Sequence, residues 1–179
     1  LFDSIKNDIV KSEIKDIYFL ETQVDLKATK DNLKIDTSGK YSFNNVDFLQ
    51  LKLDSNLKND LLQLNANFDY KNNFDLKIIN YNKPKERIAN ISLEFEKNKN
   101  ISNIKKLNFK EKNNSINISN LKFKDKNFDS FKTINVSTKN NNFSIKWDKK
   151  IIIKGSSFDA TNLPKLLNQQ GKGDNFKKI

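Results

Sequence analysis

Hydrophobic and polar residues alternate along most of this chain with a period of two. The alternation is clearest over residues 63–69, where leucine, alanine and phenylalanine take turns with glutamine, asparagine and aspartate, and it recurs over residues 90–96. Successive side chains of a strand point to opposite faces, so this period predicts half-buried β-strands. We therefore predict two regular strands here, each with its apolar side chains on one face.

The same pattern recurs from Tyr18 onward, interrupted about every dozen residues by turns rich in asparagine and lysine. Asparagine tolerates positive φ, so such turns suit β-hairpins. No strand alternates with a long amphipathic helix, which excludes a parallel α/β sheet. We predict an antiparallel meander of about ten or eleven strands, near residues 18–28, 33–43, 46–57, 62–70, 74–81, 89–96, 104–109, 116–123, 131–136, 143–147 and 151–153.

The two ends of the chain break this period. Residues 1–15 space their apolar positions more like a helix, so we predict a lead-in with a short helix there. The meander is expected to fill residues 16–160, followed by a short helix and a flexible tail over residues 161–179. Thr161 or Asn162 is the expected helix cap, and Pro164 is expected in the first turn. Asp159 is interpreted as a turn or cap residue rather than a catalytic acid.

A sheet of this size needs a partner for its apolar face. Ten strands ~4.8 Å apart extend for some ~50 Å, and strands of ten residues are ~33 Å long. A soluble protein rarely exposes to water an apolar face of that area made of leucine, isoleucine and phenylalanine. The sheet must therefore either fold into a closed core, such as a sandwich, or curl around something apolar that is not protein.

The amino-acid composition limits the kinds of catalytic or metal site that the chain can form. The chain has no cysteine and no histidine, which removes disulfides, thiol nucleophiles, zinc clusters and histidine-based acid–base catalysis. Glu94 and Glu96 lie on the polar side of one strand, where cross-strand ion pairing with lysine explains them without calcium. We expect no enzyme activity, no cofactor and no metal.

The net charge of +11 comes almost wholly from lysine, since Arg87 is the sole arginine. Nucleic-acid-binding proteins usually combine arginine with a localised basic patch, so we expect no nucleic-acid partner. Weak attraction of the lysines to anionic lipid head groups is an alternative that the sequence leaves open. The chain starts at Leu1 and contains no methionine, so we expect it to be a piece of a longer protein.

Three short motifs carry a resemblance to a known family. Residues 83–89 read Lys-Pro-Lys-Glu-Arg-Ile-Ala, and residues 92–95 read Ser-Leu-Glu-Phe. Residues 155–160 read Gly-Ser-Ser-Phe-Asp-Ala and are followed by Leu163, Leu166 and Leu167. The succession resembles the turn, strand and closing segments of the AsmA-like family of bacterial envelope proteins, with the usual proline displaced to Pro164.

That resemblance implies a fold and a function. Such proteins are anchored in the inner membrane, cross the periplasm, and form a long β-sheet bent like a taco shell whose apolar inside is proposed to carry phospholipids toward the outer membrane. We thus expect a mainly β chain, an open groove with short helices at its ends, phospholipid acyl chains as partners, and an anchor in a part of the protein outside this chain. The expected groove-lining residues are Leu64, Phe68, Ile91, Leu93, Phe95, Ile116, Ile118, Phe123, Ile145 and Trp147.

An alternative stays open beside this interpretation. The same residues could pack the closed core of a structural or adhesive β-domain that binds another protein through a sheet edge. Trp147 has two corresponding interpretations, as a core residue or as a side chain at a lipid head-group boundary.

Overall fold

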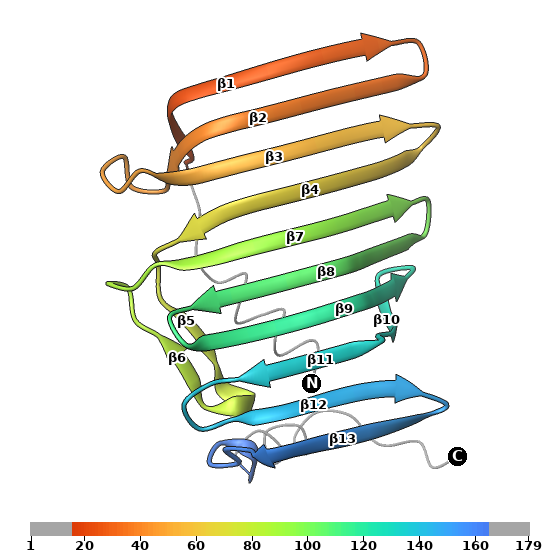
Figure 1. Ribbon diagram of the computed structural model, residues 1–179. Helices are drawn as coiled ribbons and strands as arrows, with labels where there is room; N and C mark the ends of the chain where they lie inside the picture. The colour runs from red at the N-terminus through yellow and green to blue at the C-terminus, as the bar shows by residue number, and fades with distance from the viewer. Residues whose placement is uncertain (1–15, 165–179) are drawn as a thin grey trace.

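The computed structural model describes residues 16–164, which form one large antiparallel sheet of eleven strands and a small two-stranded sheet (Figure 1). This confirms the mainly β fold predicted from the alternation. The strands of the large sheet are β1 (Tyr18–Thr29), β2 (Asn32–Ser42), β3 (Leu49–Lys58), β4 (Leu61–Tyr70), β7 (Ala89–Asn98), β8 (Ile101–Glu111), β9 (Asn114–Lys124), β10 (Asn127–Ser130), β11 (Thr133–Ser137), β12 (Asn142–Asp148) and β13 (Lys150–Ser157).

Tight turns hold the meander in register. Asn59 and Asp60, the two residues between β3 and β4, have φ of 48° and 65°, and Asp125 and Lys126 between β9 and β10 have φ of 51° and 67°. Two successive positive φ values give the hairpin turn whose twist matches that of the flanking strands. The asparagine- and lysine-rich turns therefore fix which residues face each other across neighbouring strands.

Neighbours in sequence are neighbours in the sheet with two exceptions. β11 pairs with β9 rather than with β10, and β4 pairs with β7 rather than with the next segment of chain. Residues 71–88 between them form an insertion with β5 (Phe74–Leu76), the 3₁₀-helix η1 (Lys77–Ile79) and β6 (Tyr81–Lys83). Asn80, with a left-handed φ of 48°, ends η1. The strand predicted over residues 74–81 is therefore wrong as a member of the meander, although Phe74 and Leu76 do lie in a short strand.

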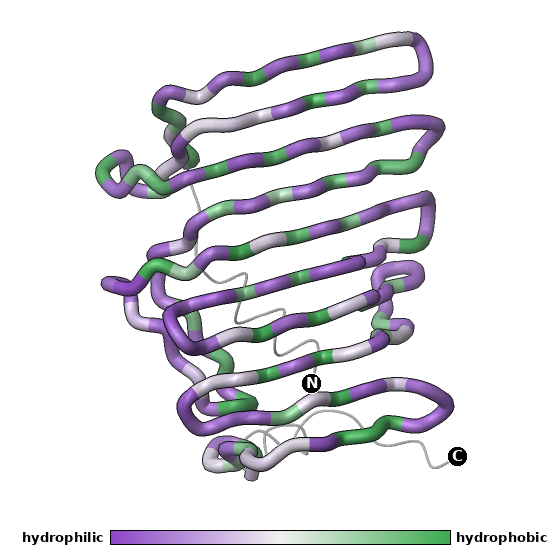
Figure 2. Tube along the Cα trace, viewed as in Figure 1, coloured by the Kyte–Doolittle hydropathy of each residue, from purple (hydrophilic) through white to green (hydrophobic). Residues whose placement is uncertain are grey.

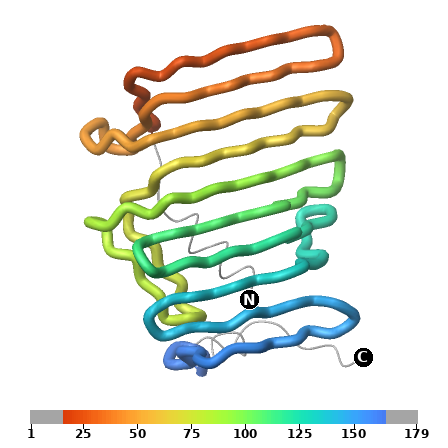
Figure 3. The backbone as a smooth tube through the Cα atoms, in the orientation of Figure 1, coloured from red at the N-terminus to blue at the C-terminus, as the bar shows by residue number. Residues whose placement is uncertain are grey.

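The core lies where this insertion packs on the large sheet. Ile79 and Tyr81 of the insertion are buried against one face of β7, β8, β9 and β11, where they meet Ala89, Phe109, Ile116 and Val136. Figure 3 shows the insertion leaving the sheet after β4 and running along the ends of the later strands before it returns at β7. Among residues 16–164, a second layer thus covers only one region of the apolar face.

Gly39 marks a bulge in the first hairpin, as its position within a predicted strand suggested. The pairing of β1 with β2 shifts between Leu20 and Gln23, opposite Gly39, and Glu21 takes a φ of 50°. A β-carbon on Gly39 would lie 2.5 Å from the Thr22 Cα. Glycine is needed here because the extra residues of β1 press directly against the β2 backbone.

The sheet does not close on itself within residues 16–164. The strand order ends at β1 on one side and at β13 on the other, and each of these strands has a single neighbour. After β13 the chain turns at Asp159, and a helix begins at Leu163 and includes Pro164, as predicted. The predicted lead-in over residues 1–15 and the rest of the C-terminal helix and tail lie outside the described residues.

Candidate functional site

One face of the sheet carries continuous rows of apolar side chains that run across neighbouring strands. Figure 2 shows the apolar positions, in green, recurring along the strands. Pairing puts side chains of the same row directly opposite each other. One row contains Leu51, Phe68, Ile91, Phe109, Ile116, Val136 and Phe143. The next contains Leu53, Ala66, Leu93, Leu107, Ile118, Ile134, Ile145 and Ile153.

All ten residues predicted to line a groove lie on this face. Phe68, Ile91 and Ile116 belong to the first row, and Leu93, Ile118 and Ile145 to the second. Leu64 and Phe95 face each other in a third row, Phe123 faces Ser102 of β8, and Trp147 faces Ile151 of β13. The register also confirms the first prediction above: the apolar residues of β4 and β7 share one face.

Burial divides this apolar face into two parts. Under the insertion, Phe109 and Ile116 are 6% and 8% exposed. Over β3, β4 and the middle of β7, the members of the same rows, such as Leu53, Phe68 and Phe95, are only half-buried. No described helix or strand packs over β1–β4 (Figure 1). On β1 the exposure is greater still, at 58% for Val24 and 61% for Leu26.

An aromatic cluster lies at the far end of the strands from the insertion. The Trp147 ring packs 5.5 Å from Phe128 and 5.4 Å from Phe131, and Phe128 lies 6.4 Å from Phe123. Phe131 is buried, and Trp147 is partly exposed beside the turn into β13. Trp147 therefore packs against other rings near the end of β12, and its role at a lipid head-group boundary stays a prediction.

Three buried polar residues, which the sequence pattern did not identify, fix the insertion in place. Lys83 is fully buried, and its Nζ donates to the carbonyls of Lys71 at 2.9 Å, Asn72 at 2.8 Å and Pro84 at 3.2 Å. The ammonium also lies 5.4 Å from the Tyr70 ring centroid. Burial lowers the pKa of Lys83, which the nearby Glu111 partly offsets. This lysine ties the entry and exit of the insertion together.

Glu111, at the end of β8, is the second of these residues and is 1% exposed. Its carboxylate accepts hydrogen bonds from Asn114 at 2.6 Å and the Tyr81 hydroxyl at 3.3 Å, and it pairs with Arg87 at 3.5 Å. Burial and then the Glu111 charge raise the pKa of Tyr81. A buried carboxylate is costly unless it is paired and hydrogen-bonded, so Glu111 holds Tyr81 and Arg87 of the inserted segment against the sheet.

Asn141, in the turn between β11 and β12, is the third. Its amide nitrogen donates to the Ile79 carbonyl at 2.9 Å, and its oxygen accepts from the Asp159 N–H at 2.8 Å. The Asp159 carboxylate accepts from the N–H of Thr161 at 3.1 Å and the amide of Asn80 at 3.0 Å. The Thr161 hydroxyl also donates to this carboxylate, and it is the main cause that lowers the pKa of Asp159 to about 2. Asp159 is the turn residue that was predicted.

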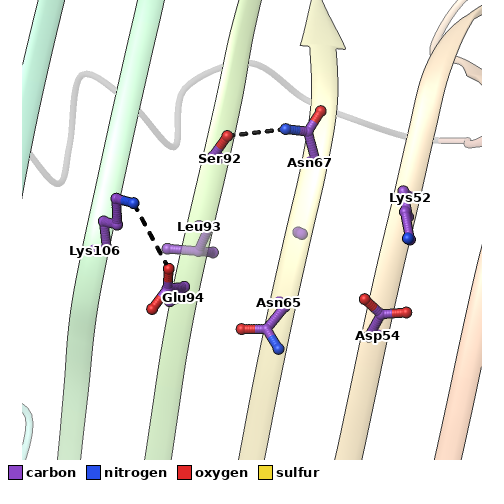
Figure 4. Close-up of a pocket in the computed structure, with 9 residues that line it drawn as sticks. Lys52, Asp54, Asn65, Asn67, Ser92, Leu93, Glu94 and Lys106 are labelled. Atoms are coloured by element: carbon purple, nitrogen blue, oxygen red, sulfur yellow. Dashed lines mark hydrogen bonds and ion pairs between the residues drawn. The ribbon is translucent and has the colours of Figure 1, made fainter.

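The opposite face of the sheet is polar and solvated. A shallow depression lies there over β3, β4, β7 and β8, and Figure 4 shows the side chains that line it. Asn67 donates to Ser92 at 2.9 Å, and Lys106 lies 3.9 Å from Glu94. Glu96 pairs with Lys105 at 2.5 Å. The cross-strand pairing predicted for the two glutamates is thus confirmed.

Two features are absent from residues 16–164. No group of three or more acidic side chains in that range is arranged to hold a metal ion. None of its helices has both the length and the apolar character needed to cross a membrane. The continuous apolar rows make the apolar face the strongest candidate site in the described structure.

Comparison with known proteins gives no match: no family model fits the chain, and no curated protein or solved structure is significantly similar to it. The resemblance to the AsmA-like family stays a prediction.

Proposed function

We propose that this chain is a module of an AsmA-like envelope protein, and that its apolar face holds phospholipid acyl chains on their way between the inner and outer membranes. In this proposal the module works in the periplasm, is anchored to the inner membrane by a segment outside this chain, and performs no chemistry. The half-exposed face then forms the inside of a groove that lipid fills.

The observation that supports this proposal is the continuity of the apolar rows over successive strands combined with their incomplete cover. A structural domain needs its apolar residues gathered under a second layer, as they are beneath Ile79 and Tyr81. The rows instead continue over β4 and β3, where no described element covers them. Each buried methylene contributes ~0.8 kcal/mol, so a chain of about sixteen carbons laid on this face has a large favourable contact energy.

A second candidate is a structural or adhesive β-domain. The observation that favours it is the open edge of β13, where Ile151 and Ile153 are 58% and 67% exposed. An unpaired edge strand can take up a strand from another protein. The two candidates differ in the face they use, because adhesion of this kind needs the edge and lipid binding needs the apolar rows.

Photocrosslinking tests the lipid proposal directly. A photoreactive residue placed singly at Phe68, Leu93 or Phe95 should crosslink to phospholipid when the protein is incubated with vesicles. The same residue at Asn67 or Glu94, on the polar face of the same strands, should not. Equal yields on the two faces, or no crosslink at any apolar position, would exclude the proposal.

A matched pair of charge substitutions separates an open face from a closed core. Leu93→Asp places a carboxylate on the half-buried part of the face, where water can reach it, so the fold should persist while lipid binding falls. Ile116→Asp places the same group under the insertion, where an unpaired charge is very costly, so the fold should be lost. Unfolding by both substitutions, judged by circular dichroism, would favour the closed domain.

A further inference from the structure

Eight lysines lie in or next to the hairpin turns at one end of the strands of the large sheet. Five turns lie at these strand ends, on the right in Figure 1: β1–β2, β3–β4, β7–β8, β9–β10 and β12–β13. We call their lysines the lysine rim. Its members are Lys30, Lys58, Lys97, Lys99, Lys124, Lys126, Lys149 and Lys150.

The lysine rim carries charge that the described protein does not neutralise through ion pairs. All eight side chains are exposed, and none makes a salt bridge within residues 16–164. The same turns contain four aspartates, which leaves a surplus of positive charge. At the opposite ends of the strands, Lys71 pairs with Asp47, Arg87 pairs with Glu111, and Lys83 is buried. Lysines such as Lys85, Lys112 and Lys139 are exposed there and make no salt bridge within residues 16–164, so the lysine rim is distinguished by the larger number of its unpaired lysines.

The aromatic cluster lies between the apolar rows and this rim. Trp147 comes directly before the turn that carries Lys149 and Lys150, and Phe123 directly precedes Lys124. On β9 the side chains change toward the rim from Ile116 and Ile118 to Phe123 and then to Lys124, and on β12 they change from Ile145 to Trp147 and then to Lys149. A phospholipid has the matching order of acyl chains, glycerol esters and charged head group, and tryptophan side chains favour that boundary in membranes.

The geometry points to a preferred ligand: the lysine rim binds the anionic head group of a phospholipid whose acyl chains lie on the apolar rows and point toward the insertion. This inference rests on the proposed lipid binding and adds its selectivity. Lysine ammonium groups on flexible stems attract phosphate as point charges, without demanding one geometry. A phosphatidylglycerol, with a net negative head group, should therefore bind in preference to a zwitterionic phosphatidylcholine with the same chains.

The test is a competition between those two lipids. The protein is incubated with vesicles of equal parts phosphatidylglycerol and phosphatidylcholine and re-isolated from them, and its retained lipid is measured by mass spectrometry. One variant replaces six rim lysines by glutamine, at positions 58, 97, 99, 126, 149 and 150. The control variant replaces six exposed lysines of the polar face, at positions 27, 52, 110, 122, 146 and 154, and so changes the net charge equally.

We expect the unchanged protein to retain about fivefold more phosphatidylglycerol than phosphatidylcholine, the effect of roughly one favourable lysine contact. The rim variant should retain the same total lipid with the ratio near one, and the control variant should keep the preference. Total retained lipid tests the proposed function, and the ratio tests the rim. Retention without a preference, or a preference lost equally in both variants, overturns the rim assignment alone; absence of retained lipid overturns both.

Discussion

Replacing Ile79 by alanine should show how strongly the insertion is held on the sheet. Ile79 is 5% exposed and packs among Phe109, Ile116 and Val136. Truncation removes the equivalent of three methylene groups, about 2.4 kcal/mol of transfer free energy, and leaves a cavity that adds to the loss. We therefore expect the free energy of unfolding to fall by about 3 kcal/mol, a large part of the stability of a typical domain.

The matched control is Ile88→Ala, the same truncation at a residue of the inserted segment that is 52% exposed. This substitution leaves no cavity, so the free energy of unfolding should fall by less than about 1 kcal/mol. Urea unfolding followed by the fluorescence of Trp147, the sole tryptophan, measures both values. If the insertion detaches before the sheet unfolds, hydrogen exchange at the Asn80 amide, which donates to the Lys77 carbonyl, should instead accelerate about a hundredfold. Equal costs for the two variants, with unchanged exchange at Asn80, would refute the packing described here.

Two further predictions concern the first hairpin and the C-terminal turn. Gly39→Ala should destabilise the protein by about 1–3 kcal/mol in the same urea titration, because the new β-carbon meets the Thr22 Cα at 2.5 Å, whereas Ser38→Ala, on an exposed neighbour, should be nearly neutral. The pKa of Asp159 in the folded protein is about 2, below its ordinary 3.8, so its stabilising effect should be complete above pH 4 and should disappear as the pH falls through about 2. Carbon-13 NMR of the Asp159 carboxyl measures the midpoint, and a value near 4 would show that its hydrogen bonds from Thr161 and Asn80 are absent in solution.

The amino-acid sequence by itself determined the strands and their faces. Alternation in β4 and β7 fixes which side chains share a face, and the paired residues Phe68 and Ile91 are a direct result. A shift of one residue would turn every apolar side chain toward water, so the pattern strongly constrains the register. The turns are equally local, because residues such as Asn59 tolerate the positive φ that a two-residue hairpin requires.

The tertiary structure alone decided where the chain leaves the sheet. Phe74, Leu76 and Ile78 alternate as a strand of the meander would, and nothing local distinguishes them from the residues of β4. They leave the sheet because β7 takes the place beside β4, a pairing between distant residues. Their apolar side chains then pack on the face of β8 and β9 instead of extending it.

The buried polar groups were also beyond the reach of sequence patterns. Lys83, Glu111 and Asn141 lie in or near segments rich in charge and asparagine, which usually face solvent. They are buried because residues far apart in the chain supply their partners, such as the Ile79 carbonyl for Asn141. Burial of a polar group is tolerated only when such partners are in place, and only the assembled fold puts them there.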